Sequence, residues 1–265
     1  MEPLWDEQGR DVFTAPFLWP LSSRSPGEGG GAAGALIIVA AGDVHSPRYL
    51  LQYMAALAKH RDECSRAGIL IWAGDMVDRG RVSALEAVVE ASRRSCPSAR
   101  IVAVFGNEEY MDREEEFIRR YPSVVWLNDT YIVVEEDIKL AIYGSRGVLD
   151  RPTRWQRRHI PGIEAIYRHR AERAAAALRE LRGKADKVIL VTHYAPTRLT
   201  LEGEDPRIWP ELGSTIMERV VLETAPDLAI HGHAHRSKRL EAVLGRTRVI
   251  NVALPARGDV AVIDL

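Results

Sequence analysis

The sequence predicts a layered α/β domain. Runs of apolar, often β-branched residues alternate with segments of helical periodicity along most of the chain. Several strand-like segments then follow one another near the C-terminal end, and groups of polar residues come directly after five of the apolar runs. Alternating strands and helices fold as sheets covered by helices, and open α/β sheets place their sites at the ends of their strands.

Three strands alternate with three helices in the first half of the domain. The strands are continuous apolar runs, which are typical of strands buried on both faces. The first helix has Leu50, Leu57 and Cys64 at helical spacing, and the last opens on acidic Asp112, which is favourable near a helix N-terminus. In chain order, we expect these elements at Leu36–Ala41, Pro47–Ala67, Ile69–Ala73, Ser83–Ser95, Ile101–Phe105 and Asp112–Arg120.

The second half contains more strands than helices. A long helix with Ile166, Leu178 and Leu181 on one stripe is preceded by Pro152 and Pro161, which predict a loop there. In chain order, we expect strands at Val124–Leu127, Tyr131–Glu135 and Lys139–Tyr143, the long helix at Ile163–Arg182, a strand at Lys187–Thr192, a helix at Thr215–Thr224, and closing strands at Leu228–His231, Arg239–Val243, Arg248–Val252 and Val260–Asp264.

A tail and a linker precede this domain, which we place at residues 35–265. Residues 22–34 are rich in Gly, Ser and Pro, which predicts a flexible linker. Residues 1–21 contain four aromatic side chains, which either pack on the domain surface or form a contact with a partner or a second copy of the chain. These aromatic residues are Trp5, Phe13, Phe17 and Trp19.

Composition excludes several classes of protein. The chain has 265 residues, 46% hydrophobic and 28% charged, which excludes global disorder. Lys and Arg total 36 against 37 Asp and Glu, a net charge of −1. A general binder of polyanions is normally more basic than this, so any attraction to phosphate must be local.

The protein is expected to be cytoplasmic. No apolar run approaches the ~18–20 residues that span a bilayer, and the charged first 21 residues lack the apolar stretch of a secretory signal. Two cysteines, Cys64 and Cys96, are too few for a disulfide framework or a zinc ribbon. They indicate a reducing interior, although a single bond between them is left open.

Seven side chains after the predicted strands form a metal-binding pattern. Asp43 and His45 are two residues apart, which in extended chain puts both on one face. Imidazole, carboxylate and amide donors suit Mn, Fe, Zn, Co or Ni better than Ca or Mg. Seven donors are too many for one tetrahedral ion and about right for two, which together clamp an in-line displacement at phosphorus. The seven residues are Asp43, His45, Asp75, Asn107, His193, His233 and His235.

These residues resemble the calcineurin-like metallophosphoesterases, whose pattern is D-x-H, G-D-x-x-D, G-N-H-[DE], H and G-H-x-H in that order. The resemblance runs from Leu36 to Leu265 and implies a four-layer αββα sandwich with a dinuclear metal centre. It implies that Asp75 bridges the two metals and that Asp78 orients a ligand histidine. It assigns the first metal to Asp43, His45, Asp75 and His235, and the second to Asp75, Asn107, His193 and His233.

Three neighbouring residues are candidates for catalysis. Glu108 stands where the family places a histidine that protonates the leaving group. Either Glu108 is buried among apolar groups and acts as a neutral acid with a raised pKa, or another group supplies the proton and activity is lower. Arg79 resembles the arginine that binds the substrate phosphate in Ser/Thr phosphoprotein phosphatases. The alternative interpretation of Arg79 is a residue that forms a salt bridge at the start of a helix. The alternative interpretation of Asp78 is the N-cap of the following helix.

Residues 151–173 are locally basic, with seven arginines against two glutamates. This segment is either a solvated helix face or a basic lip that recruits phosphorylated or nucleic-acid substrates, with Trp155 as a stacking platform.

The sequence therefore predicts a phosphoester hydrolase that uses two divalent transition-metal ions, manganese first, with iron, zinc, nickel or cobalt as alternatives. Phosphodiesters or nucleotides are favoured over phosphoproteins, because no second domain is available to dock a protein. The alternatives are a nuclease that uses residues 151–173, and a scaffold in which Glu108 blocks catalysis and the tail binds a partner. A homo-oligomer through the tail is left open, and no membrane partner is expected.

Overall fold

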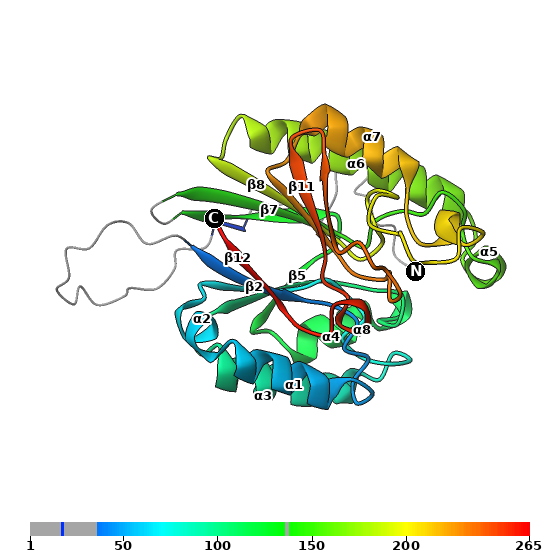
Figure 1. The fold of residues 1–265 in the computed structure, drawn as a ribbon. Helices are drawn as coiled ribbons and strands as arrows, with labels where there is room; N and C mark the ends of the chain where they lie inside the picture. Colours follow the sequence, from blue (N-terminus) through cyan, green and yellow to red (C-terminus); the bar gives the residue numbers. More distant parts are fainter. Residues whose placement is uncertain (1–16, 19–35, 136–137) are drawn as a thin grey trace.

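Two stacked β-sheets with helices on both outer faces form the computed structural model (Figure 1), which describes residues 17–18, 36–135 and 138–265. The predicted linker at residues 22–34 lies outside the described residues. The division of the chain at residue 35 stays a prediction.

A five-stranded sheet contains the first half of the domain. Its order is β12-β2-β3-β4-β5, in which β2 to β5 are parallel and β12 runs antiparallel to β2. Its central strands β2 and β3 are apolar along their whole length because both faces of this sheet are covered. The strands are β2 (Ile37–Ala41), β3 (Ile69–Trp72), β4 (Arg100–Val104), β5 (Val124–Leu127) and β12 (Ala261–Asp264).

Helices cover the outer face of this sheet (Figure 1). Leu57, Leu85 and Phe117 from three of these helices pack in one buried cluster with Trp72 of β3. The helical elements of this half are α1 (Leu50–Lys59), α2 (Arg61–Arg66), η1 (Val82–Ala84), α3 (Leu85–Ser95), η2 (Met111–Arg113) and α4 (Glu114–Arg120).

The prediction of one helix over residues 47–67 is wrong, because the chain breaks between α1 and α2. At His60 the backbone leaves helical geometry (φ −102°, ψ 38°), and its side chain contacts Asp259, with Nε2 3.1 Å from Oδ1.

Cys64 of α2 is joined to Cys96 by a disulfide, with their Cα atoms 4.4 Å apart. The bond that the sequence left open is therefore present in the structure.

A seven-stranded sheet contains the second half, in the order β1-β6-β7-β8-β9-β11-β10. β7, β8, β9 and β11 are parallel, while β6 pairs antiparallel with β7 and β10 with β11, each as a hairpin. The strands are β1 (Phe17–Leu18), β6 (Thr130–Glu135), β7 (Lys139–Ser145), β8 (Lys187–Thr192), β9 (Leu228–His231), β10 (Glu241–Leu244) and β11 (Thr247–Asn251).

The backbone of Phe17 and Leu18 pairs in parallel with Ile132 and Val133 of β6. Part of the predicted tail therefore joins the edge of the second sheet. The other aromatic residues of the tail, Trp5, Phe13 and Trp19, lie outside the described residues.

Two long helices, α6 (Ile163–Arg182) and α7 (Thr215–Thr224), cover the outer face of the second sheet (Figure 1). A separate buried cluster that includes Ile38, Ile142 and Ile230 fills the space between the two sheets. The four layers confirm the expected αββα sandwich.

Among the described residues, no helix is both long enough and apolar enough to cross a membrane.

The loop predicted before α6 contains the short helix α5 (Arg154–His159). Thr153 caps it: its hydroxyl accepts a hydrogen bond from the Gln156 backbone N–H at 3.2 Å, and the Gln156 side chain accepts one from the Thr153 N–H at 2.8 Å. This capping box is a recognisable sequence signal for a helix start. The other short helices are η3 (Trp209–Glu211) and α8 (Leu254–Arg257).

Candidate metal centre

All seven predicted ligands converge at one edge of the two sheets. The chain leaves β2, β3 and β4 at the same edge because these strands are parallel, and β8 and β9 bring in the three histidines of the second half. The first loops are joined by backbone hydrogen bonds, from the Asp43 N–H to the Gly74 carbonyl and from the His45 N–H to the Asp75 carbonyl, both at 2.9 Å.

Glycine is required where a carboxylate lies against the neighbouring loop. A Cβ at Gly106 would lie 2.1 Å from Oδ1 of Asp75, and one at Gly232 would lie 2.4 Å from Oδ2 of Asp43. The glycines of the third and fifth motifs therefore make room for these two acidic side chains.

Asp43, His45 and His235 form a first group of potential ligands, whose donor atoms lie within 4.8 Å of one another. Nε2 of His235 lies 2.8 Å from Oδ1 of Asp43, and Nε2 of His45 lies 3.9 Å from the same oxygen. Oδ2 of Asp43 accepts a hydrogen bond from the His233 backbone N–H at 2.9 Å.

Asp75, His193 and His233 form a second group with the same compactness. Nε2 of His193 lies 3.4 Å from Oδ2 of Asp75 and 3.1 Å from Oδ1 of Asn107. Oδ2 of Asp75 also lies 3.7 Å from Nε2 of His45. Asp75 is therefore placed between the two groups, as its predicted bridging role requires.

The donor atoms fit divalent cations. Both ring nitrogens of His45 are buried without a hydrogen-bond partner among the described residues, although carboxylates lie close by. Nδ1 of His193 donates to the Ala73 carbonyl at 2.9 Å, which leaves its Nε2 facing two oxygen acceptors. Metal-bound histidines are commonly fixed in this way, and a cation would satisfy nitrogen and oxygen donors together.

The charges of the two groups are tightly coupled. Burial lowers the pKa of His193, but the carboxylates of Asp75 and Asp43 outweigh that effect and raise it to about 9. Burial raises the pKa of Asp75, but His193 outweighs it and holds this pKa well below its usual range. Burial, assisted by the charge of His193, lowers the pKa of His233 to about 3. Asp75 is thus an ionised oxygen donor and His233 a neutral nitrogen donor.

The backbone of the site is not extended, contrary to the sequence prediction. Asp43, His45, Asp75 and His233 have φ values of 59°, 43°, 53° and 68°. Non-glycine residues seldom adopt this left-handed region, and such conformations cluster at functional sites. The two residues of the D-x-H motif therefore converge through a turn rather than through the alternation of a strand.

Glu109 is a residue of this site that the sequence analysis missed. Its buried carboxylate accepts hydrogen bonds from the backbone N–H groups of Asp75, Met76, Val77 and Gly106, at 2.7 to 3.1 Å. Burial, reinforced by the charge of Asp75, raises the pKa of Glu109 to about 7 despite these bonds. The acidic position that closes the family's third motif was the available signal.

Glu108 does not have the burial that its predicted role as a neutral acid requires. Its side chain is half-buried, and Oε2 accepts a hydrogen bond from the Arg79 backbone N–H at 2.7 Å. In the structure, Glu108 therefore links the loop that contains Asn107 to the loop that contains Asp75 and Asp78.

Asp78 and Arg79 lie at the rim of the first group. Oδ1 of Asp78 is 3.8 Å from Nδ1 of His45, which agrees with an orienting role. The predicted N-cap alternative for Asp78 is wrong, because the N-cap of η1 is Arg81. Arg81 also supplies the ion pair to Asp78, at 3.5 Å, and the side chain of Arg79 is exposed.

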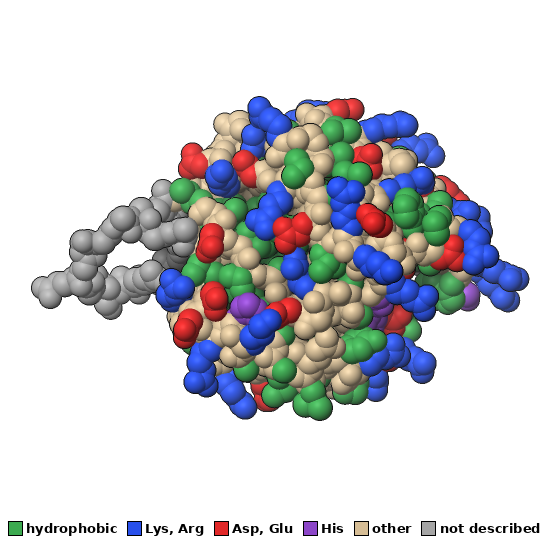
Figure 2. Space-filling model, in the orientation of Figure 1, with side chains coloured by type: hydrophobic (Ala, Val, Ile, Leu, Met, Phe, Trp, Pro, Cys, Tyr) green, Lys and Arg blue, Asp and Glu red, His purple; other side chains and the backbone are tan. Residues whose placement is uncertain are grey.

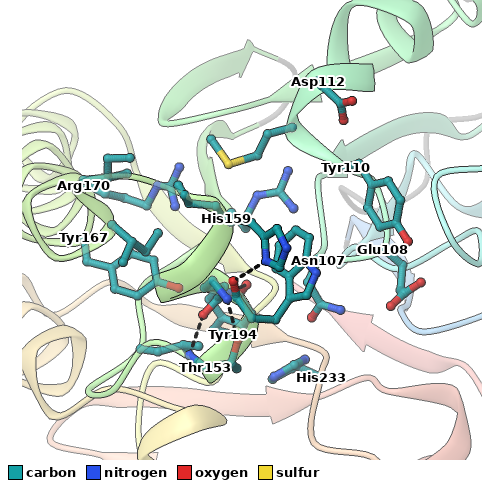
Figure 3. Close-up of a pocket in the computed structure, with 18 residues that line it drawn as sticks. Asn107, Glu108, Tyr110, Asp112, Thr153, His159, Tyr167, Arg170, Tyr194 and His233 are labelled. Carbon is teal, nitrogen blue, oxygen red and sulfur yellow. Dashed lines mark hydrogen bonds between the residues drawn. The ribbon is translucent and has the colours of Figure 1, made fainter.

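A cavity of about 600 Å³ adjoins the second group (Figure 3). Asn107 and His233 lie at its inner end, with Glu108 and Tyr110 on one wall and Tyr167 of α6 on the opposite wall (Figure 3). Such a volume is typical of a small-molecule site and is far more than a phosphoryl group alone would fill.

The arginines of the predicted basic lip at residues 151–173 differ in their burial and in their ion-pair partners. Arg170 is buried, with Nε 2.9 Å from Oδ2 of Asp129, and Arg151 pairs with Glu211 at 3.0 Å. The outward arginines of α5 are exposed, and Figure 2 shows basic side chains gathered at the edge where Figure 1 places this helix.

Known structures share the fold of this chain. A phosphopantetheinyl hydrolase from Mycobacterium tuberculosis aligns over 87% of this chain and 96% of its own, at 16% identity and a TM-score of 0.61. The inner-membrane-complex anchor of Plasmodium aligns over 84% and 73%, at 13% identity and a TM-score of 0.59. A putative 5'-nucleotidase from Staphylococcus aureus aligns over 82% and 48%, at 16% identity and a TM-score of 0.50.

A comparison with curated protein sequences finds no match. The family model for the calcineurin-like phosphoesterases, in contrast, matches residues 36–237, which is most of the chain and includes every potential ligand described above. The chain therefore belongs to the calcineurin-like phosphoesterase family and is a metal-dependent phosphoesterase.

Proposed function

We propose that the two ligand groups hold two divalent transition-metal ions and that the protein hydrolyses small phosphodiesters or nucleotides. The single observation that carries this proposal is the juxtaposition of the groups. Asp75 approaches histidines of both, at 3.4 and 3.7 Å, beside a cavity large enough for an organic ester. The mixed nitrogen and oxygen donors favour manganese, with iron, zinc, nickel or cobalt as alternatives.

Each side chain has a defined part in this proposal. Asp43, His45 and His235 hold the first ion, while Asn107, His193 and His233 hold the second, and Asp75 contributes to both. Two ions held there would neutralise the charge that develops on the phosphoryl oxygens during in-line displacement.

The protein's own groups orient the ligands and the substrate. The negative charge of Asp78 beside Nδ1 of His45 favours the tautomer with its proton on that nitrogen. Nε2 is then left free toward Asp43 and Asp75. Arg79, exposed at the rim, contacts the phosphate of the bound ester.

Glu108 does not supply the proton to the leaving group in this proposal, because its Oε2 is already engaged by the Arg79 backbone N–H. Esters with good leaving groups are then the best substrates, since they need little protonation. Replacement Glu108→His is expected to accelerate alkyl phosphate esters by about 10-fold or more while changing p-nitrophenyl esters little. Slower turnover of alkyl esters by Glu108→His would overturn this view of Glu108.

The direct test is metal-dependent release of p-nitrophenol from bis-p-nitrophenyl phosphate, compared with p-nitrophenyl phosphate, across Mn, Ni, Co and Zn. We expect turnover of the diester to exceed that of the monoester. A folded, metal-loaded protein that turns over neither substrate would instead favour the scaffold alternative.

A further inference from the structure

We propose that the cavity beside the second ligand group selects phosphoesters whose organic part is uncharged and apolar or aromatic. This inference rests on the proposed function, because it concerns the substrate of the same site. Three properties of the cavity carry it: its apolar lining, an exposed aromatic stack at its wall, and the balance of its charges.

The lining of the cavity is mainly apolar. Leu149, Ile160 and Ile163 line it together with the aromatic rings of Tyr167 and Tyr194. An apolar lining of this kind gains free energy mainly when it excludes water from apolar surface of the ligand. The organic part of the ester is therefore expected to be the portion that fills it.

Trp155 gives the wall a flat aromatic face. Its side chain is 57% exposed although it lines the cavity, and its ring stacks on His159 with centroids 4.7 Å apart and planes 23° apart. Nδ1 of His159 donates to the Trp155 carbonyl at 2.8 Å, which fixes the stack. An exposed, pre-positioned indole beside a cavity is suited to stacking on a planar ligand group.

Among the described residues that line the cavity, no Lys or Arg is left unpaired to bind a second anionic group. The two arginines of the cavity are neutralised, Arg146 by Glu114 at 2.5 Å and Arg170 by Asp129 at 2.9 Å. The opposite wall adds the carboxylates of Glu108 and Asp112 (Figure 3).

An anionic substituent on the organic part would therefore be repelled. The exposed arginines of α5 at positions 154, 157 and 158 do not offset this, because they are not among the side chains that line the cavity.

The test uses three non-hydrolysable ligands of matched shape: benzylphosphonate and its 4-carbamoyl and 4-carboxy derivatives. Binding to the metal-loaded protein is followed by titration calorimetry, which also reports binding to variants that lack the Trp155 ring. We expect the carbamoyl ligand to bind about 10-fold more tightly than the carboxy ligand. Asp112→Asn should reduce that ratio to about threefold.

Trp155→Ala should weaken the binding of all three ligands by about 5- to 10-fold. Its matched control is Leu51→Ala, because Leu51 is exposed on α1 and does not line the cavity. Equal or tighter binding of the carboxy ligand, or unchanged affinity in Trp155→Ala, would overturn the proposal. So would tighter binding of a short oligonucleotide than of every phosphonate, which would favour a nuclease.

Turnover of bis-p-nitrophenyl phosphate by the same samples separates this proposal from the proposed function. Absent turnover with intact discrimination among the phosphonates overturns the hydrolase and retains the preference of the cavity. Turnover without discrimination overturns the preference alone.

Discussion

The two ligand groups have the same kinds of donor but different surroundings. In the first group, Asp43 is fully buried and both of its oxygens are occupied, by His235 and by the His233 backbone. In the second, His233 and its neighbour Asn107 line the cavity, whereas no member of the first group is among its lining residues. Under the proposed function, the first group would anchor the centre and the organic part of the substrate would approach from the second.

The two groups also differ in how they would exchange protons for metal. In the second group the pKa of His193 is raised to about 9, while that of His233 is lowered to about 3. In the first group, burial lowers the pKa of His235, but its hydrogen bond to Asp43 and the charges of Asp43 and Asp75 together outweigh burial and raise this pKa. The second group therefore contains one histidine that must lose a proton and one that is already neutral.

Asp75→Ala should have the largest effect, because one oxygen of this carboxylate lies near the ring nitrogens of histidines in both groups. Turnover of bis-p-nitrophenyl phosphate should fall by more than about 100-fold. Asp62→Ala, which removes an exposed carboxylate on α2, should leave the rate unchanged. A rate within about threefold of the wild type in Asp75→Ala would show that the groups are not joined through this residue.

The next effect concerns stability. Glu109→Gln places an amide N–H₂ against backbone N–H groups that now donate to a carboxylate. Because buried donors are then left unpaired, the free energy of unfolding should fall by about 2–4 kcal/mol in urea titrations. Glu108→Gln, at the half-buried neighbouring position, should cost less than about 1 kcal/mol. Similar losses in the two variants would contradict a special role for Glu109.

Metal affinity should depend on pH because of His193. Below about pH 9 this histidine carries a proton in the metal-free protein, and a metal ion must displace it. The affinity for Mn²⁺ should rise by up to about 10-fold per pH unit between pH 7 and 9 and then level off. Calorimetry in buffers of different ionisation enthalpy measures the released proton. His193→Asn should reduce the pH dependence, and an unchanged dependence in that variant would assign the proton elsewhere.

The smallest effect is expected from the exposed arginines of α5. Replacing Arg154, Arg157 and Arg158 together with alanine should change turnover of bis-p-nitrophenyl phosphate by less than about twofold, because their charges are solvated and outside the cavity. A much larger loss, accompanied by a weaker salt dependence of nucleic-acid binding, would support the nuclease alternative.

The sequence predicted most of the fold and the side chains that converge at the candidate site, because both depend on local patterns. Continuous apolar runs marked β2, β3 and β4, and five motifs in a fixed order marked Asp43 to His235. The break at His60 could not be predicted in this way, since the apolar spacing continues from Leu57 to Cys64 on both sides of it. Its side chain contacts Asp259, which lies far away in the sequence.

The chemistry around the ligands was less predictable for the same reason. The four N–H groups that surround the Glu109 carboxylate come from two loops, and only the folded chain brings them together. The burial of Glu108 and the direction of each arginine between 151 and 173 also depend on tertiary contacts. The alternation rule failed at Asp43 and His45 because both residues have a left-handed backbone, which sequence spacing does not report.

The most direct test of the central claim is the metal content of the purified protein. Elemental analysis of the wild type and of the double variant Asp75→Ala/His233→Ala should give two transition-metal ions per chain in the first and fewer than one in the second. An unchanged number of bound ions in the double variant would contradict the account.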